Sequence, residues 1–255
     1  MTEDTPTAFF ARLDVAGAPR ELVALGGRVD VETLLAAYRA GCFPWPVTGT
    51  DGVVLDRDAR RLARRGDVPL VPGTDPAVPL MPWISPHPRP VLLPDRVNIP
   101  RSVRRSIRRR GWETTVDRAF GDVLAACADR PETWITPEMR TGYQALHRAG
   151  IAHSLEVWAG DDLVGGLYGV LTGRVFNGES MFHHEDDASK AAVVDLCQRF
   201  REGGVVLIDT QDESEHMANL GQVLVNRADY IDVLHAFRDE PVQLPADRRP
   251  VTRCL

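Results

Sequence analysis

Two short segments in the second half of the chain place carboxylate and amide side chains at the ends of apolar runs. Glu179 lies near the end of the strand-like run 174–181, and Asp209 and Gln211 follow the apolar run 205–208. A polar cluster just beyond the carboxyl end of a buried strand is a common place for a binding site. The Asp209 carboxylate can accept the amide proton of Gln211, which leaves the Gln211 carbonyl oxygen free to accept a proton or hydrogen bond from a substrate amine.

A carboxylate at position 179 can face the cationic form of such an amine. A free α-amino group has a pKa of about 8, so at neutral pH it needs positioning more than a strong base. The alternative is structural. Glu179 is then a solvated residue at a strand end, and Asp209 caps the helix that follows. The residues alone leave both interpretations open.

Large apolar side chains accompany these polar residues along the chain. Their simplest role is to form the core, but methionine and phenylalanine beside Glu179 also leave room for a pocket that takes a long apolar side chain. The candidate pocket residues are Leu167, Phe176, Met181, Leu196, Phe200 and Ile208.

Several familiar catalytic motifs are missing from the sequence. It contains no Walker A motif, no GxGxxG and no GxSxG, so we expect that any acyl group it transfers arrives already activated. The segment 183–187, His-His-Glu-Asp-Asp, matches no zinc or calcium spacing. We therefore predict no metal and no cofactor.

The charge distribution indicates a polyanionic partner. The net charge is −6, which argues against indiscriminate binding of nucleic acid, yet residues 101–110 contain six arginines and no acid. A basic patch on an acidic protein suits a polyanion held at one place and chemistry done at another. The arginines are Arg101, Arg104, Arg105, Arg108, Arg109 and Arg110.

The composition is that of a cytoplasmic protein with a sizeable core. Of its residues 44% are hydrophobic, and no run approaches the ~20 apolar residues of a membrane span. The acidic N-terminus lacks the basic region of a secretory signal. Four scattered cysteines form no CxxC pair, so we expect reduced thiols.

The first 90 residues show one clear helix and two irregular stretches. The helix follows Asp30, a typical N-cap, and ends before Gly41. We expect 47–80 to be a long surface excursion, disordered in part, with a short helix near 57–65. Segment 82–90 has too many prolines for a central strand, so we predict a stiff connection and a domain junction there.

Beyond residue 90 the patterns alternate between helix and strand. A run of helices, an antiparallel meander, a helix and a strand indicate an α+β fold around a mixed sheet. Helices are expected at 100–110, 117–128, 137–150, 188–202, 216–220 and 230–237, and strands at 112–116, 152–159, 162–171, 174–181 and 205–209.

Taken together and in this order, the motifs of the chain resemble those of the leucyl/phenylalanyl-tRNA–protein transferases over about residues 22–237. The motifs are Tyr38-Arg39-x-Gly41-x-Phe43-Pro44-Trp45, Ser85-Pro86-x-Pro88-Arg89, Thr133-Trp134-Ile135, Leu146-His147-x-x-Gly150-x-Ala152-His153-Ser154-x-Glu156, Leu163-Val164-Gly165-Gly166-Leu167-Tyr168-Gly169, Gly178-Glu179-Ser180-Met181-Phe182, Ala188-Ser189-Lys190 and Ile208-Asp209-x-Gln211.

This resemblance implies a small N-terminal domain, 1–90, and an acyltransferase domain, 91–255, related in fold to the Gcn5-type N-acetyltransferases. It implies transfer of Leu or Phe, with Met a further candidate, from charged tRNA to the N-terminal Arg or Lys of a protein, which marks that protein for degradation. Asp209, Gln211 and Glu179 would be catalytic, and the apolar set would hold the aminoacyl side chain.

The resemblance also implies where the partners bind. Trp45 and Trp134 would lie at the acceptor site beside Glu179, and the arginines of 101–110 would contact tRNA phosphates. Two other hypotheses stay open. The same chemistry could serve a small-molecule amine, since 82–87 departs from the family pattern and 47–80 is long. The chain could also bind tRNA without catalysis.

Overall fold

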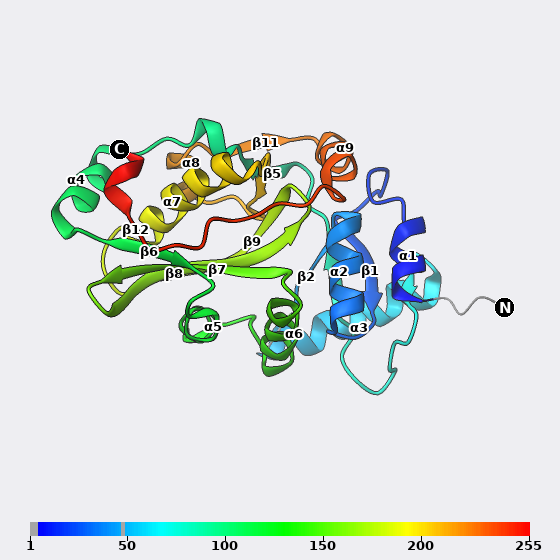
Figure 1. Cartoon of the computed structure of the whole chain (residues 1–255). Helices are drawn as coiled ribbons and strands as arrows, with labels where there is room; N and C mark the ends of the chain where they lie inside the picture. The colour runs from blue at the N-terminus through cyan, green and yellow to red at the C-terminus, as the bar shows by residue number, and fades with distance from the viewer. Residues whose placement is uncertain (1–4, 47–48) are drawn as a thin grey trace.

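The computed structural model describes residues 5–46 and 49–255 and contains two β-sheets with helices packed on them (Figure 1). The smaller sheet has the strand order β2-β4-β1-β3, and the larger has the order β11-β5-β10-β9-β8-β7-β6-β12. The helices are α1 (Pro6–Arg12), α2 (Val31–Ala40), α3 (Gly49–Arg65), α4 (Arg101–Arg110), α5 (Phe120–Ala128), α6 (Pro137–Arg148), α7 (Ala188–Gly203), α8 (Glu215–Asn219) and α9 (Arg227–Phe237). This mixed arrangement confirms the predicted α+β class.

The smaller sheet lies entirely within residues 22–84 of the described chain. It consists of β1 (Leu22–Gly26), β2 (Phe43–Pro44), β3 (Leu70–Val71) and β4 (Pro82–Ile84). Helix α2 begins as predicted, with the Asp30 side chain accepting a hydrogen bond from the Thr33 N–H at 2.9 Å. It ends at Gly41, whose φ of 87° suits glycine.

The segment after the first helix pair is more regular than expected. Residues 47–48 lie outside the described chain, but α3 runs from Gly49 to Arg65 and β3 adds a parallel strand to β1. Arg60 ties the segment together, because it pairs with Asp56 at 2.7 Å and donates to the carbonyl oxygens of Pro76 and Val78. The helix expected near 57–65 is therefore present, but it is longer than predicted and begins at Gly49.

The proline-rich segment 82–90 contributes two central strands, which the sequence argued against. β4 lies between β2 and β1, and β5 (Arg89–Leu92) lies between β11 (Val223–Val225) and β10 (Leu207–Asp209). The prolines are tolerated because they supply carbonyl oxygens: Pro82 accepts from the Trp45 N–H at 2.9 Å, and Pro90 accepts from the Thr210 N–H at 3.1 Å. The two sheets divide within this segment, and the domain boundary at residue 90 stays a prediction.

The larger sheet is built on the predicted meander. Antiparallel strands β7 (Ala152–Ala159), β8 (Asp162–Thr172) and β9 (Val175–His183) form its centre, and β6 (Glu113–Val116) and β12 (Arg249–Pro250) extend one side. Helix α7 packs on one face, and α5 and α6 pack on the other (Figure 1). β10 follows α7 and runs parallel to β9.

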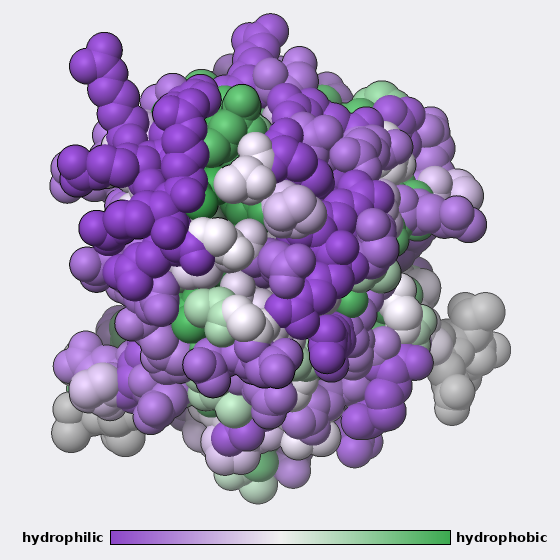
Figure 2. All heavy atoms as spheres, turned by 60° about the vertical axis from the view of Figure 1, so that its left-hand side comes forward, coloured by the Kyte–Doolittle hydropathy of each residue, from purple (hydrophilic) through white to green (hydrophobic). Residues whose placement is uncertain are grey.

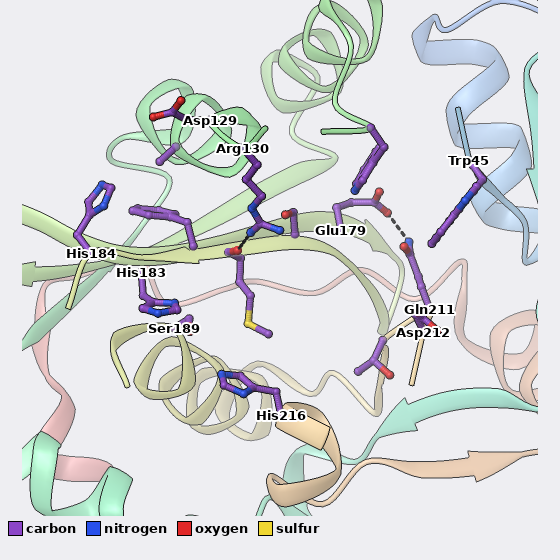
Figure 3. A pocket seen from close by; sticks show the side chains of 16 residues that line it. Trp45, Asp129, Arg130, Glu179, His183, His184, Ser189, Gln211, Asp212 and His216 are labelled. Carbon is purple, nitrogen blue, oxygen red and sulfur yellow. Dashed lines mark hydrogen bonds between the residues drawn. The ribbon is translucent and has the colours of Figure 1, made fainter. Parts of the chain in front are cut away.

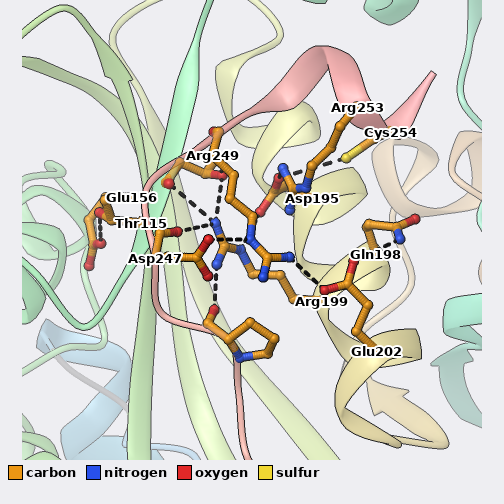
Figure 4. Close-up of polar contacts among 12 residues, drawn as sticks. Thr115, Glu156, Asp195, Gln198, Arg199, Glu202, Asp247, Arg249, Arg253 and Cys254 are labelled. Carbon is orange, nitrogen blue, oxygen red and sulfur yellow. Dashed lines mark hydrogen bonds and ion pairs between the residues drawn. The ribbon is translucent and has the colours of Figure 1, made fainter.

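The C-terminal segment is tied to the larger sheet by Arg199 of α7 (Figure 4). Its guanidinium is fully buried and pairs with Asp195 at 2.7 Å. It also donates to the carbonyl oxygens of Pro245, Asp247 and Thr114. A buried arginine needs such complete pairing, so the last residues of the chain cover α7 and β6 rather than trailing away from them.

Candidate active site

The pairing of β9 with β10 brings Glu179 and Gln211 together. In this parallel pair Asp209 lies opposite Asn177, and Ile208 lies opposite Phe176. Continuing the same register by two residues places Gln211 opposite Glu179. Their side chains do meet, because the Gln211 Nε2 donates to Glu179 Oε1 at 2.7 Å.

Asp209 is held by a buried arginine that the sequence analysis did not single out. Arg89 Nε donates to Asp209 Oδ1 at 3.0 Å and its Nη2 donates to Oδ2 at 2.5 Å, with both side chains fully buried. The guanidinium carbon lies 4.3 Å from the ring centre of Tyr230 and 4.9 Å from that of Phe43. Burial by itself would lower the pKa of Arg89, but the Asp209 carboxylate outweighs it and raises that pKa.

The expected contact between Asp209 and the Gln211 side chain does not form. Asp209 Oδ1 instead accepts the backbone N–H of Gln211 at 3.0 Å, which closes a tight turn. Gln211 has a φ of 64°, a left-handed conformation that is uncommon outside glycine. Asp209 is 0% exposed, so it reaches no cavity surface itself and holds the turn at Gln211 from within the protein.

Glu179 is the centre of a buried polar cluster. Besides Gln211, it accepts hydrogen bonds from the hydroxyl of Tyr38 at 2.7 Å and from that of Tyr143 at 2.5 Å. The two hydroxyls lie 2.8 Å from each other. Burial raises the pKa of Glu179 to about 7, against the opposing effect of these three hydrogen bonds.

Glu179 and Gln211 line an open cavity of about 750 Å³ (Figure 3). Trp45, which is 41% exposed, and Trp134 line the same cavity, so the predicted acceptor-binding residues Trp45 and Trp134 lie beside the catalytic candidates Glu179 and Gln211. Figure 3 shows Trp45 and Gln211 on one side of the cavity and His183 and His184 on the other.

A smaller apolar cavity of about 180 Å³ adjoins the first, and Glu179 lines both. Five of the six predicted aminoacyl-pocket residues line it, and Val193 and Met217 add to them. Phe200 is the exception, because it lies behind Phe176 with ring centres 5.0 Å apart and reaches no cavity surface. The five are Leu167, Phe176, Met181, Leu196 and Ile208.

The basic helix α4 lies apart from the tryptophan end of the cavity but next to the start of α7. Val103 and Ile107 face inward and are fully buried, whereas most of the arginines are exposed. Ser106 donates to Asp187 at 2.8 Å, and Asp187 pairs with Lys190 at 2.9 Å. Ser189, which lies between Asp187 and Lys190 in the sequence, lines the large cavity. The contacts of Ser106 and Asp187 therefore join α4 to the edge of that cavity.

The surface that carries α4 is largely hydrophilic, with a narrow recessed strip of hydrophobic and neutral residues (Figure 2). Among the described residues no group of three or more His, Cys, Asp or Glu side chains is arranged to hold a metal ion. None of the helices in 5–46 and 49–255 is long and apolar enough to cross a membrane.

Comparison with known proteins gives the same family as the motifs. The family model described as leucyl/phenylalanyl-tRNA protein transferase matches residues 91–235, and the model of its N-terminal domain matches 27–54. The chain belongs to this family. A transferase of the family from Shewanella sp. (strain ANA-3) is 41% identical over 228 residues, 88% of this chain and 84% of that protein.

Other relatives support the same assignment. The leucyl/phenylalanyl-tRNA–protein transferases of Pseudomonas aeruginosa (strain LESB58) and Azotobacter vinelandii are each 40% identical over 227 residues, 88% of this chain and 88% of theirs. A solved structure of a conserved protein of unknown function from Bacteroides thetaiotaomicron aligns with a TM-score of 0.39 and 12% identity, over 96% of this chain and 94% of that one. A TM-score this low does not establish a shared fold, so the Gcn5-type relationship stays a prediction.

Sequence reasoning missed the residues that support the site from a distance. Tyr38, Tyr143 and Arg89 received no role, although Tyr38 and Arg89 stand within family motifs. Each reaches its partner across a long sequence separation, 141 residues for Tyr38 and Glu179 and 120 for Arg89 and Asp209. No local pattern in the sequence signals pairings across such separations.

The raised pKa of Glu179 predicts a pH-dependent stability. Because this pKa rises from the usual 4.5 to about 7 in the folded state, the stability it contributes is full below about pH 4.5 and is lost as the pH rises through about 7. Relative to Glu179→Gln, the wild type should lose about 3 kcal/mol of unfolding free energy between about pH 4.5 and about pH 8. Urea unfolding at both pH values measures this difference.

The exposed Glu132 supplies the control. Glu132→Gln should leave the pH dependence of unfolding unchanged. If Glu179→Gln also leaves it unchanged, Glu179 titrates in the folded protein as it does in the unfolded chain, near pH 4.5, and the raised pKa is contradicted.

Proposed function

We propose that the chain transfers leucine or phenylalanine from charged tRNA to the α-amine of an N-terminal Arg or Lys of a protein. The relatives are named for this reaction, and the observation that carries the proposal is the position of Glu179 between the two cavities. An amine placed beside Glu179 and Gln211 lies at the mouth of an apolar pocket that suits a single large side chain.

The reaction needs no energy source besides the tRNA ester. The amine nitrogen attacks the ester carbonyl carbon, the bond from that carbon to the tRNA ribose oxygen breaks, and the oxygen leaves with a proton. With its Nε2 donating to Glu179, Gln211 keeps its Oε1 to accept a hydrogen bond from the attacking amine. Gln211 thereby orients the nitrogen, and such positioning contributes much of the rate.

The apolar cavity is suited to more than one aminoacyl side chain. Met181 and Met217 line it together with Leu196, and methionine side chains adapt to ligands of different shape. This flexibility supports the use of both leucine and phenylalanine, and it keeps methionine as a further candidate.

The large cavity is suited to a cationic acceptor. Trp45 and Trp134 supply aromatic faces and Glu179 supplies a carboxylate, and a guanidinium or ammonium group binds favourably over an indole ring. The exposed arginines of α4 are the proposed contact for tRNA phosphates, and the charged tRNA donor makes the cytoplasm the proposed location. A Gcn5-type ancestry of the larger sheet and a domain boundary at residue 90 remain part of the proposal.

The direct test uses tRNA charged with labelled leucine and a peptide beginning with Arg. We expect label on the peptide, none on the same peptide with an acetylated N-terminus, and a loss of about 100-fold in kcat/KM for Gln211→Ala because the amine is no longer oriented. Gln243→Ala is the matched control, since Gln243 is exposed. Label on a small amine but on no peptide would instead make a small molecule the acceptor.

A second test addresses the basic helix. Arg105→Ala with Arg108→Ala removes two exposed charges from α4, so tRNA binding should weaken and the slope of log K against log salt should fall by about one to two. Filter binding over a series of salt concentrations measures the slope. Arg28→Ala with Arg148→Ala removes two exposed charges elsewhere and should leave it unchanged. Equal slopes for all three proteins would remove α4 from the tRNA contact.

A further inference from the structure

Three oxygen-bearing side chains from three different elements form a closed ring in the interior. Tyr38 comes from α2, Tyr143 from α6 and Glu179 from β9, and both tyrosines are 0% exposed. The Tyr38 hydroxyl lies 2.8 Å from the Tyr143 hydroxyl and 2.7 Å from Glu179 Oε1, and the Tyr143 hydroxyl lies 2.5 Å from Glu179 Oε2. The ring therefore contains three contacts of hydrogen-bond length.

Counting protons shows that the ring is complete only when Glu179 is neutral. Each tyrosine hydroxyl has one proton to donate, and an ionised carboxylate has none. Two protons cannot make three hydrogen bonds, so one of the three contacts has no hydrogen bond while Glu179 is charged. A proton on Oε2 fills it: Oε2 donates to Tyr143, Tyr143 donates to Tyr38, and Tyr38 donates to Oε1.

The ionised form is also accommodated. Both tyrosine hydroxyls can then turn their protons to the carboxylate, and Gln211 continues to donate to Oε1 at 2.7 Å. Three hydrogen bonds to a charged acceptor are strong. The change from one form to the other needs only the gain or loss of the proton on Oε2 and the rotation of the Tyr143 O–H bond. Tyr38 donates to Oε1 in both forms, and no heavier atom moves.

The hydrogen-bond donors around Glu179 carry no charge, and the neighbouring Asp209 carboxylate favours the neutral form. The hydrogen bonds that Glu179 accepts within the described chain all come from neutral donors. On β10, Asp209 repels a charge on Glu179, and Arg89 is already paired with Asp209. On β8, the hydroxyl of Tyr168 is buried without a hydrogen-bond partner. On the cavity side, the titratable groups are Asp129, Arg130, His183, His184, Asp212 and His216.

We propose that Tyr38, Tyr143 and Glu179 share one exchangeable proton, and that Glu179 accepts this proton from the ammonium group of the acceptor. This inference rests on the proposed function. The acceptor arrives as R–NH₃⁺, and one N–H bond breaks as the proton moves to the Glu179 carboxylate. The neutral amine then attacks the ester, a second amine proton leaves with the ribose oxygen, and Glu179 later returns its proton to water in the open cavity.

Tyr38 and Tyr143 touch no substrate in this scheme, so they are positioning residues that set the proton affinity of Glu179. Burial raises the pKa of Glu179 to about 7, close to that of the amine it serves. Removing either hydroxyl takes one hydrogen bond to a charge from the ionised form and two neutral ones from the ring. Because the hydrogen bonds from Tyr143 and Tyr38 lower the pKa of Glu179 on balance, losing one should raise that pKa further by about one unit.

The first measurement is a ¹³C NMR titration of the carboxyl carbon of Glu179, assigned by its disappearance in Glu179→Gln. We expect a midpoint near pH 7 in the wild type, about one pH unit higher in Tyr38→Phe and Tyr143→Phe, and unchanged in Tyr168→Phe. The last is the matched control, because it deletes a buried tyrosine hydroxyl outside the ring. A wild-type midpoint below about pH 5, or equal midpoints in all four proteins, would overturn the shared proton.

The second measurement is the pH profile of kcat/KM for a peptide acceptor in the same proteins. The amine of the peptide titrates identically in each, so a shift between proteins reports the enzyme. In Tyr38→Phe and Tyr143→Phe, the fall of kcat/KM on the acid side should move to higher pH by the same amount as the NMR midpoint. In the wild type and Tyr168→Phe it should stay in place. An acid limb that stays in place while the NMR midpoint moves would overturn proton uptake by Glu179.

The two measurements separate this inference from the proposed function. The NMR titration needs no tRNA, so it judges the ring even if no peptide is labelled. Absence of transfer to every peptide would defeat the proposed function and, with it, the use of the proton. If one ring variant fails to fold, the other still tests the same prediction, since each removes one member of the ring.

Discussion

The buried ion pair between Arg89 and Asp209 is the interaction on which the site depends. Arg89 stands at the start of β5, and its guanidinium also donates to Gly41 and Ser85 beside the smaller sheet. Asp209 ends β10 of the larger sheet. One cluster therefore fixes the end of α2, the proline-rich connection and the carboxyl end of β10. Because breaking a buried pair by removing one partner costs about 3–5 kcal/mol, this arrangement has little freedom to relax.

The ion pair also separates the duties of the two buried carboxylates. The charge of Asp209 is neutralised by Arg89, and Asp209 also accepts a hydrogen bond from the backbone N–H of Gln211. Glu179, two residues beyond the part of β9 that pairs with β10, is surrounded by neutral donors and opens onto the cavities. One acid thus holds the turn at Gln211, and the other, Glu179, faces the cavities without a cationic partner. Two carboxylates in contrasting environments commonly take different roles in catalysis.

Local patterns predicted the elements but not the contacts between them. The helix after Asp30, the meander at 152–181 and the helix beginning at Ala188 have strong periodicity and caps, and each is present. The pairing of Arg89 with Asp209 joins residues 120 apart, and no local pattern reports it. The prolines at 82 and 90 led to the wrong prediction for a related reason. Whether the N–H that a proline lacks would have had a partner depends on the neighbouring strands of the sheet. Gln211 lies just past the end of β10, as predicted. The expectation that Glu179 ends its strand was wrong, because β9 continues to His183. The direction of the Gln211 amide required the register.

We infer that Asp209 contributes to transfer only through the turn that presents Gln211. The decisive measurement is the transfer rate per folded molecule for Asp209→Asn, Gln211→Ala and the double variant. We predict that the double variant is as slow as Gln211→Ala alone, within about a factor of two. Once the Gln211 side chain is gone, the turn that Asp209 holds no longer positions a group that acts on the amine. A double variant slower by the product of the two single losses would show that Asp209 acts on the reaction independently of Gln211 and would contradict the account.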